Sequence, residues 1–423
     1  GTKPVFVLQT KKINSYLLSL SKDLLLFGPA LGANSYDKFM IGGFVANLKL
    51  PPSRFQFFLA PMYATGSKKF TGIGFINHSF YPDGIFRKID IGINASTFSY
   101  NEFPKLNGEK INFSFTKVSP ELKLTFRQKD ARSTLNKFIQ WRTYFINEQT
   151  YGSIFYDTII NIPDTTINQV VPVISENRVL NQFKLVMENY RALYPYRGEL
   201  KIEQGKDFVR AAFTGKYFFN YAKQGGLTVR LFAGKFFYTG SKTFSKQFAT
   251  DRYHLNMTGA NGYEDYTYSD YFIGRNKFDG LPSQQIMMKD GGFKIRTDLL
   301  SDKVGKTDNW LIATNFTTTI PSNINPLNLL PVKIPLKVFV DIGTYAEAWK
   351  PNAGTDRFLY DAGLYIPLFK ETINIYVPLI YSDVYKNYIQ SNLPKKNRLL
   401  KTISFSIDIV DFSLRKFDRN LDF

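Results

Sequence analysis

Residues 88–97 of the chain read Lys88-Ile89-Asp90-Ile91-Gly92-Ile93-Asn94-Ala95-Ser96-Thr97. Every odd position in it is apolar or a β-branched Thr, and every even position is polar or Gly. Because successive side chains of a strand point to opposite faces, this pattern predicts a strand with one apolar and one polar face. About a dozen segments repeat it, ending with Thr402-Ile403-Ser404-Phe405-Ser406-Ile407-Asp408-Ile409.

Two architectures need such strands: a soluble sandwich, which buries the apolar faces, and an outer-membrane barrel, which turns them toward lipid. The pattern runs to the C-terminus without a linker, which favours one closed sheet. The 16% aromatic content, with 40 Phe and 26 Tyr, fits the aromatic girdles of a barrel. No apolar run reaches the roughly 20 residues of a transmembrane helix. The sequence therefore predicts an all-β fold, a single closed antiparallel transmembrane β-barrel in the bacterial outer membrane.

The strand count follows from the same pattern. Strands are predicted at 23–34, 38–49, 54–66, 71–82, 85–99, 110–127, 135–148, 177–190, 196–204, 207–220, 226–238, 284–298, 309–320, 332–347, 356–367, 371–380 and 400–412, with a short extra one at 263–273. Because single-chain bacterial barrels have an even number of strands, we expect about 16, with 14 to 18 allowed. One helix is predicted, at Asp383–Asn392, with Pro394 just beyond its end.

The connections between these strands alternate in length. One class consists mostly of short turn sequences such as Tyr81-Pro82-Asp83-Gly84, and the other class contains the two longest connections, near 149–176 and 239–283. Short periplasmic turns and long external loops are typical of outer-membrane barrels. Since the chain begins at Gly1 without Met, we expect residues 1–22 to lead in from an upstream domain and residues 23–423 to form the barrel.

Residues that carry catalytic chemistry are scarce. The chain has no Cys and only two His, His78 and His254, at spacings that match no metal-ligand motif. No GxSxG elbow or phosphate-binding Walker loop is present. Carboxylates gather at 251–270 (Asp251, Glu264, Asp265 and Asp270), but they match no calcium-loop spacing. We expect no catalytic, cofactor-binding or metal-ligating residue, and a chain that is not itself an enzyme.

The net charge of +19 comes from Lys and Arg residues that are spread through strands and turns. Because they form no basic run or arm, nucleic acid is not the expected partner. The expected partners are the bilayer, its anionic outer-membrane glycolipid, and outer-membrane or periplasmic proteins. Charges on the polar faces are expected to point into the lumen, where both signs on neighbouring strands would pair and close it rather than form a conducting pore. The candidates are Lys88, Asp90, Lys184, Glu188, Arg210, Lys216, Arg230, Lys337, Asp341 and Asp361.

Several segments resemble one known group of proteins. They are Gly28-Pro29-Ala30-Leu31-Gly32-Ala33-Asn34-Ser35-Tyr36-Asp37-Lys38-Phe39-Met40-Ile41-Gly42-Gly43, Leu50-Pro51-Pro52-Ser53-Arg54-Phe55, Leu59 to Lys69, Gly259-Ala260-Asn261-Gly262-Tyr263 and Asp290-Gly291-Gly292-Phe293. Together they resemble the C-terminal barrel region of Bacteroidota proteins whose N-terminal part is a zinc aminopeptidase of the aminopeptidase N family. The glycine-rich first strand more distantly resembles BamA-type surface-antigen barrels. The zinc-binding HExxH helix is absent, so no catalytic residue carries over.

Two functions of different classes follow. The first is a structural role, in which the barrel anchors a periplasmic aminopeptidase-like domain or acts as a scaffold for partner proteins. The alternative is a pore, a transporter or a BamA-like insertase. An upstream HExxH domain would indicate the first role, and repeated periplasmic modules would indicate an insertase.

Overall fold

The computed structural model describes residues 25–47, 53–130, 132–160, 165–221, 225–241, 252–300, 304–321, 323–329, 334–369 and 371–408. The predicted lead-in at 1–22 lies outside these residues. So does Asp251 of the predicted carboxylate cluster.

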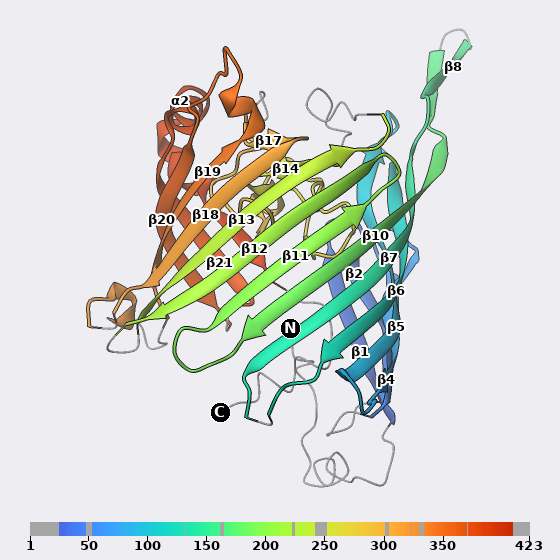
Figure 1. The fold of residues 1–423 in the computed structure, drawn as a ribbon. Helices are drawn as coiled ribbons and strands as arrows, with labels where there is room; N and C mark the ends of the chain where they lie inside the picture. The colour runs from blue at the N-terminus through green and yellow to red at the C-terminus, as the bar shows by residue number, and fades with distance from the viewer. Residues whose placement is uncertain are drawn as a thin grey trace.

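One antiparallel sheet of 16 strands makes up most of the molecule, and Figure 1 shows it curved into a barrel. In sheet order the strands are β1 (Leu25–Asn34), β2 (Lys38–Asn47), β3 (Phe55–Ala64), β4 (Phe70–Phe80), β5 (Phe86–Pro104), β6 (Lys110–Phe126), β7 (Leu135–Tyr151), β10 (Val173–Asn189), β11 (Tyr196–Gln204), β12 (Phe208–Asn220), β13 (Gly226–Tyr238), β18 (Trp310–Thr319), β19 (Lys337–Tyr345), β20 (Leu359–Leu368), β21 (Ile373–Tyr381) and β22 (Ser404–Ile407). The predicted all-β class and number of strands are confirmed.

One of the seventeen predicted strands, 284–298, is wrong. Only Ile286–Met287 (β16) is extended there, paired with Gly259–Ala260 (β15) outside the main sheet. The segment alternates Phe293 and Ile295 with Lys294 and Arg296, yet all four side chains are buried. Its sequence has the alternation of an amphipathic strand, but its charged residues are buried because they form ion pairs inside the molecule. The short strand expected at 263–273 is also absent, since these residues form turns.

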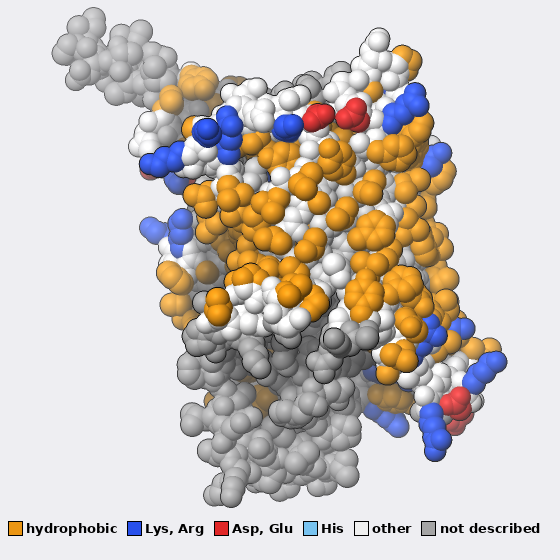
Figure 2. All heavy atoms as spheres, turned by 90° about the vertical axis from the view of Figure 1, so that its left-hand side faces the viewer, with side chains coloured by type: hydrophobic (Ala, Val, Ile, Leu, Met, Phe, Trp, Pro, Cys, Tyr) orange, Lys and Arg blue, Asp and Glu red, His pale blue; other side chains and the backbone are white. Residues whose placement is uncertain are grey.

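The outer face of the sheet is apolar. In β5, Ile91 is 52% exposed whereas Asp90 beside it is buried, and β1 alternates in the same way along its whole length. Figure 2 shows a broad apolar band across the face in view, with Lys and Arg side chains along its upper border and at its lower right. An apolar band flanked by polar rims is the surface that a bilayer requires. The chain is therefore a transmembrane β-barrel of the bacterial outer membrane.

Most of the longer connections lie at one end of the barrel. We propose that this end is the external one, since outer-membrane barrels have short periplasmic turns and longer external loops. The connection near 149–176 carries a hairpin, β8 (Phe155–Ile160) with β9 (Thr165–Val170), and Figure 1 shows it extending beyond the wall. Between β21 and β22 lie α2 (Asp383–Asn392), which confirms the predicted helix, η5 (Lys395–Asn397) and α3 (Arg398–Thr402). The remaining short helices are η2 (Leu281–Gln284), η3 (Pro326–Leu329) and η4 (Ala346–Trp349). Among the described residues no helix is long and apolar enough to cross a membrane.

Candidate functional site in the lumen

The connection between β13 and β18 folds back into the barrel, as Figure 1 shows. We call its described residues, 252–300 and 304–309, the plug. Two short antiparallel strand pairs stabilise it. One is β14 (Leu255–Asn256) with β17 (Lys306–Thr307), and the other is β15 with β16. The predicted external loop at 239–283 is thus largely an internal element. Aromatic residues of this loop, such as Tyr266 and Tyr268, are buried against the wall.

One buried ion cluster joins the plug to β11 and β12. The guanidinium of Arg210 on β12 pairs with Glu203 of β11 and with Asp290 of the plug. The hydroxyl of Tyr266 in the plug donates to Glu203 at 2.7 Å. Because charges removed from water are costly unless they are paired, both carboxylates depend on Arg210. Arg210 therefore fixes the plug to this part of the wall.

A second cluster joins the plug to β19 and β20. Asp341 and Asp361 lie directly opposite each other in the ladder between these strands. The ammonium of Lys294 in the plug lies 2.6 Å from Asp341, and the backbone N–H groups of Lys294 and Ile295 donate to Asp361. Two carboxylates at facing positions repel each other. Lys294 brings a positive charge from the plug to this pair, so the plug stabilises the two carboxylates of the wall.

A third cluster lies toward the external end, around Glu148 of β7. Glu148 pairs with Arg178 of β10 at 2.6 Å and with Arg252 at the start of the plug. The hydroxyl of Tyr100 on β5 donates to the same carboxylate at 2.9 Å. The ring of Tyr268 in the plug stacks on Phe115 of β6, with the ring centroids 3.9 Å apart. The plug is thus held on a second side of the barrel.

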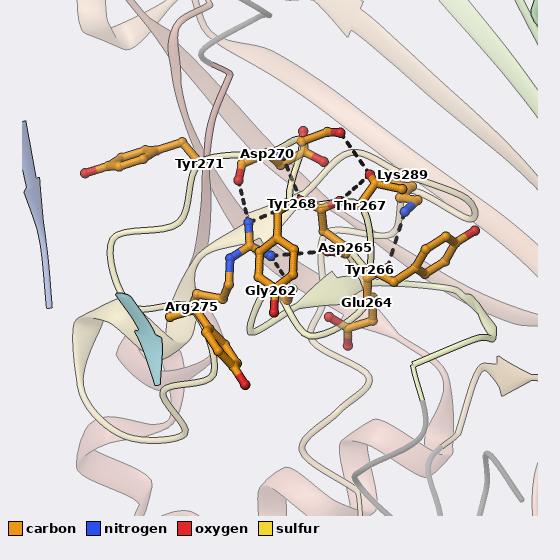
Figure 3. A network of polar contacts seen from close by, with 12 residues as sticks. Gly262, Glu264, Asp265, Tyr266, Thr267, Tyr268, Asp270, Tyr271, Arg275 and Lys289 are labelled. Carbon is orange, nitrogen blue, oxygen red and sulfur yellow. Dashed lines mark hydrogen bonds and ion pairs between the residues drawn. The ribbon is translucent and has the colours of Figure 1, made fainter. Parts of the chain in front are cut away.

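The carboxylates predicted at 251–270 serve the plug itself, as Figure 3 shows. Asp265 pairs with Arg275 at 3.2 Å and accepts from the backbone N–H of Asp270. Although burial favours the neutral acid, Arg275 and Lys289 hold the pKa of Asp265 below its ordinary value. Burial raises the pKa of Glu264 to about 6, even though Lys306 lies 3.4 Å away. Among the described residues no group of three or more His, Cys, Asp or Glu is placed to hold a metal ion.

Five of the predicted lumen charges fall in a single register row across the wall. The row runs from β7 to β20 through directly opposed residues, namely Asn136, Glu188, Arg197, Lys216, Arg230, Asn315, Asp341 and Asp361. We propose that this row lines the lumen, since neighbouring positions on the same strands are exposed on the lipid side. Glu188 pairs with Arg197 at 3.0 Å, and Arg230 donates to Asn315 at 2.7 Å.

The other predicted charges lie outside this row. Lys88 lies 3.4 Å from buried Asp90, which also accepts from Ser79. Lys337 pairs with Glu371 at one end of β19. Lys184 faces Lys201 across the β10–β11 ladder, and Arg210 belongs to the first cluster. The prediction missed Lys294, Asp290 and Arg252. Their partners lie 47 to 104 residues away along the chain, and nothing local in the sequence indicates that this loop folds into the lumen.

The plug also contacts both terminal strands of the sheet. Gln285 forms a parallel β-bridge with Phe405 of β22. The side-chain amide of Gln285 accepts from the backbone N–H of Ile273 at 2.8 Å and donates to the carbonyl of Tyr271 at 2.6 Å. The segment so held reaches β1, because the Tyr271 hydroxyl donates to the carbonyl of Ala33 and the N–H of Ser35 donates to Ile273 at 2.7 Å. Residues 271–285 thus connect the first strand to the last on the inner side.

Matches to known proteins come from solved structures alone. No family model matches the chain, and no curated protein matches it. Among solved structures it is similar to BamA from Haemophilus ducreyi lacking POTRA domains 1–3 (TM-score 0.44, 9% identity, 85% of this chain and 67% of that one). It is also similar to CdiB from Acinetobacter baumannii (0.40, 11%, 85% and 56%) and CdiB from Escherichia coli (0.41, 10%, 86% and 61%), and spans less than two thirds of either CdiB chain. One of these structures is a BamA and two are CdiB proteins, and none is an aminopeptidase.

Proposed function

We propose that this barrel acts as an insertase, which accepts other polypeptides as strands at the junction between β1 and β22. We call this junction the seam. The observation that carries the proposal is the contact of one plug segment, residues 271–285, with both terminal strands. A lumen occupied through several buried ion clusters is poorly suited to a permanently open pore. The working surface is then the seam rather than the lumen.

The physical basis is the chemistry of a strand edge. An edge strand offers backbone N–H and C=O groups that can pair with an added strand. In lipid, every backbone polar group must be paired within protein, so an incoming polypeptide gains greatly from such an edge. At Phe405 the backbone position next to β22 is occupied by Gln285. Release of this bridge would make that edge available to a substrate strand.

The anchor role expected from the sequence remains the second candidate. It would place an aminopeptidase-like domain on the periplasmic side, and the comparisons do not support it. The plug contacts at the seam favour the insertase, because a passive anchor needs no element that joins its first and last strands from within.

A reversible cross-link tests the proposal, and the chain suits it because it has no native Cys. Ser35→Cys with Ile273→Cys would tie β1 to the plug through residues that are hydrogen-bonded in the structure. The control pair is Gln204→Cys with Val209→Cys, which face each other in the β11–β12 hairpin away from the seam. Each full-length protein is reconstituted in vesicles and mixed with an unfolded outer-membrane barrel polypeptide, and acquisition of protease resistance is measured.

We expect the seam pair to accelerate insertion when reduced and to lose that acceleration when oxidised. The control pair should be active in both states. If the reduced proteins insert no more substrate than empty vesicles, the insertase proposal is wrong. If oxidised and reduced seam pairs are equally active, release of the plug at the seam is not part of the mechanism.

A further inference from the structure

We infer that the segment between β21 and β22, residues 383–402, binds the phosphate groups of an anionic glycolipid in the outer leaflet. We call this segment the rim helix pair; it comprises α2, η5 and α3. The inference goes beyond the proposed function and does not depend on it. It rests on the charge of the segment, its apolar exposure and its position at the border of the lipid-facing band.

The rim helix pair carries a strong positive charge. It contains five basic residues, Lys386, Lys395, Lys396, Arg398 and Lys401, against a single acid, Asp383. The four lysines are exposed, and none of them forms an ion pair with a carboxylate among the residues that the structure places. Clusters of exposed lysines at a membrane border attract anionic lipid headgroups.

Internal contacts fix the orientation of this segment. Ser382, at the start of α2, exchanges hydrogen bonds with the backbone of Tyr360 on β20. Tyr385 and Ile389 on α2 are buried in the apolar core of the barrel. Arg398 donates to the carbonyls of Leu393 and Gln390, which folds α3 back on α2. The side chain of Arg398 is thus committed to structure, which leaves the lysines for a ligand.

The exposed side of α3 is apolar as well as basic. Leu399 is 53% exposed and Leu400 is 64% exposed. On β21, which contacts α3, Leu379 and Ile380 near the end of the strand are also exposed. Leucines beside lysines on a short helix are typical of an element that lies in the membrane interface. From inside the barrel, the side-chain amide of Gln284 in the plug donates to the carbonyls of Leu400 and Ile403. These two hydrogen bonds hold α3 at the border of the lipid-facing band.

An aromatic residue pair marks the same border on the adjacent connection. Trp349 and Phe358 are exposed between β19 and β20, and their rings meet edge to face with centroids 6.0 Å apart. Arg357 lies over the Trp349 ring at 4.9 Å. Trp is enriched at the level of lipid headgroups. Figure 2 shows basic side chains in a row along the upper border of the apolar band on this face of the barrel.

The occupant that fits is a phosphorylated glycolipid rather than a protein. An acidic protein partner would satisfy the lysines but would leave Leu399 and Leu400 facing its polar surface. A lipid supplies phosphates to the lysines and acyl chains to the leucines and to the β21 surface below them. Because the site is on the external side, the lipid is one of the outer leaflet.

The test uses the full chain in detergent and a glycolipid that carries two phosphates, with bound copies counted by native mass spectrometry. The variant is Lys395→Gln/Lys396→Gln/Lys401→Gln. The matched control, Lys129→Gln/Arg132→Gln/Lys137→Gln, removes the same charge from exposed positions at the opposite rim. A second variant, Leu399→Ser/Leu400→Ser, removes the apolar contact and keeps every charge. Heat-dependent gel mobility verifies that each protein is folded.

We expect the lysine variant to bind the glycolipid at least about tenfold more weakly than the parent protein. The control variant should bind it like the parent protein. The leucine variant should also bind more weakly, and the dephosphorylated glycolipid should not distinguish the lysine variant from the parent. Equal binding by the lysine variant and the control would overturn the inference. Competition by inorganic phosphate at concentrations equal to those of the glycolipid would overturn the assignment to a lipid.

Discussion

Gln285 is bridged through its main chain to Phe405 of the last strand, while its side chain holds the plug segment that contacts the first strand. One residue thus links the two ends of a 16-stranded sheet from inside the barrel.

Gln285→Ala should loosen the seam contact of the plug. The change removes two hydrogen bonds and leaves the N–H of Ile273 and the carbonyl of Tyr271 without their side-chain partner. The expected loss of stability is about 1–3 kcal/mol, because the backbone groups are left unsatisfied in a largely buried place. Hydrogen exchange at 271–285 should become faster. Gln390→Ala, on the exposed face of α2, is the control and should change neither quantity.

Lys294→Met should destabilise the barrel strongly. Without this ammonium, Asp341 and Asp361 face each other across the β19–β20 ladder and lose the cation that lies 2.6 Å from Asp341. Leaving a buried charge unpaired costs about 3–5 kcal/mol, which urea unfolding in detergent would measure. Lys350→Met is the matched control, since Lys350 is exposed and lies 3.9 Å from Glu347, and it should cost under about 1 kcal/mol. Equal costs for the two variants would mean that Lys294 does not hold the plug.

Ile91→Arg should destabilise the folded barrel by about 2–4 kcal/mol near the bilayer midplane. Ile91 is exposed on the lipid-facing side of β5, so a charge there meets hydrocarbon. Leu106→Arg, in the exposed turn between β5 and β6, should cost about 0–1 kcal/mol. Folding equilibria in vesicles measure both. A larger cost for Leu106→Arg would reverse the assignment of the membrane band.

Glu264→Gln should stabilise the plug at neutral pH and leave it unchanged in acid. Burial raises the pKa of Glu264 from an ordinary 4.5 to about 6. Below pH 4.5 the carboxyl is protonated in both the folded and unfolded states, and the favourable contribution of the neutral form is fully present. As the pH rises through 6, that contribution is lost. The variant should therefore gain roughly 2 kcal/mol over the parent at pH 7.5 and almost nothing at pH 4. A constant difference across this range would contradict the raised pKa.

The alternation of apolar and polar residues was sufficient to predict the wall of the barrel. A strand between lipid and a wet interior must show period two, and Ile91 and Asp90 illustrate the two faces. The plug was not predictable in the same way. Phe293, Lys294, Ile295 and Arg296 alternate like a strand, but their partners lie on wall strands and elsewhere in the plug that local pattern does not identify.

The predicted charges show the same limit. The strand register is largely determined by turn lengths and by the apolar pattern. This register places four predicted charges in one row: Lys216, Arg230, Asp341 and Asp361. That Lys294 would complete the row from a distant loop depends on tertiary folding. Sequence reasoning identified the charged inner wall but could not identify the element that packs against it.

The most direct test of the account measures the distance between the terminal strands while a substrate is present. Spin labels are attached at Leu31→Cys on β1 and Phe405→Cys on β22, in a chain with no other Cys, and the distance distribution is recorded in vesicles. We predict one short distance for the protein alone and a second, longer population when an unfolded barrel polypeptide is added. A distribution that stays unchanged while substrate insertion is accelerated would contradict the proposal that the seam is the working surface.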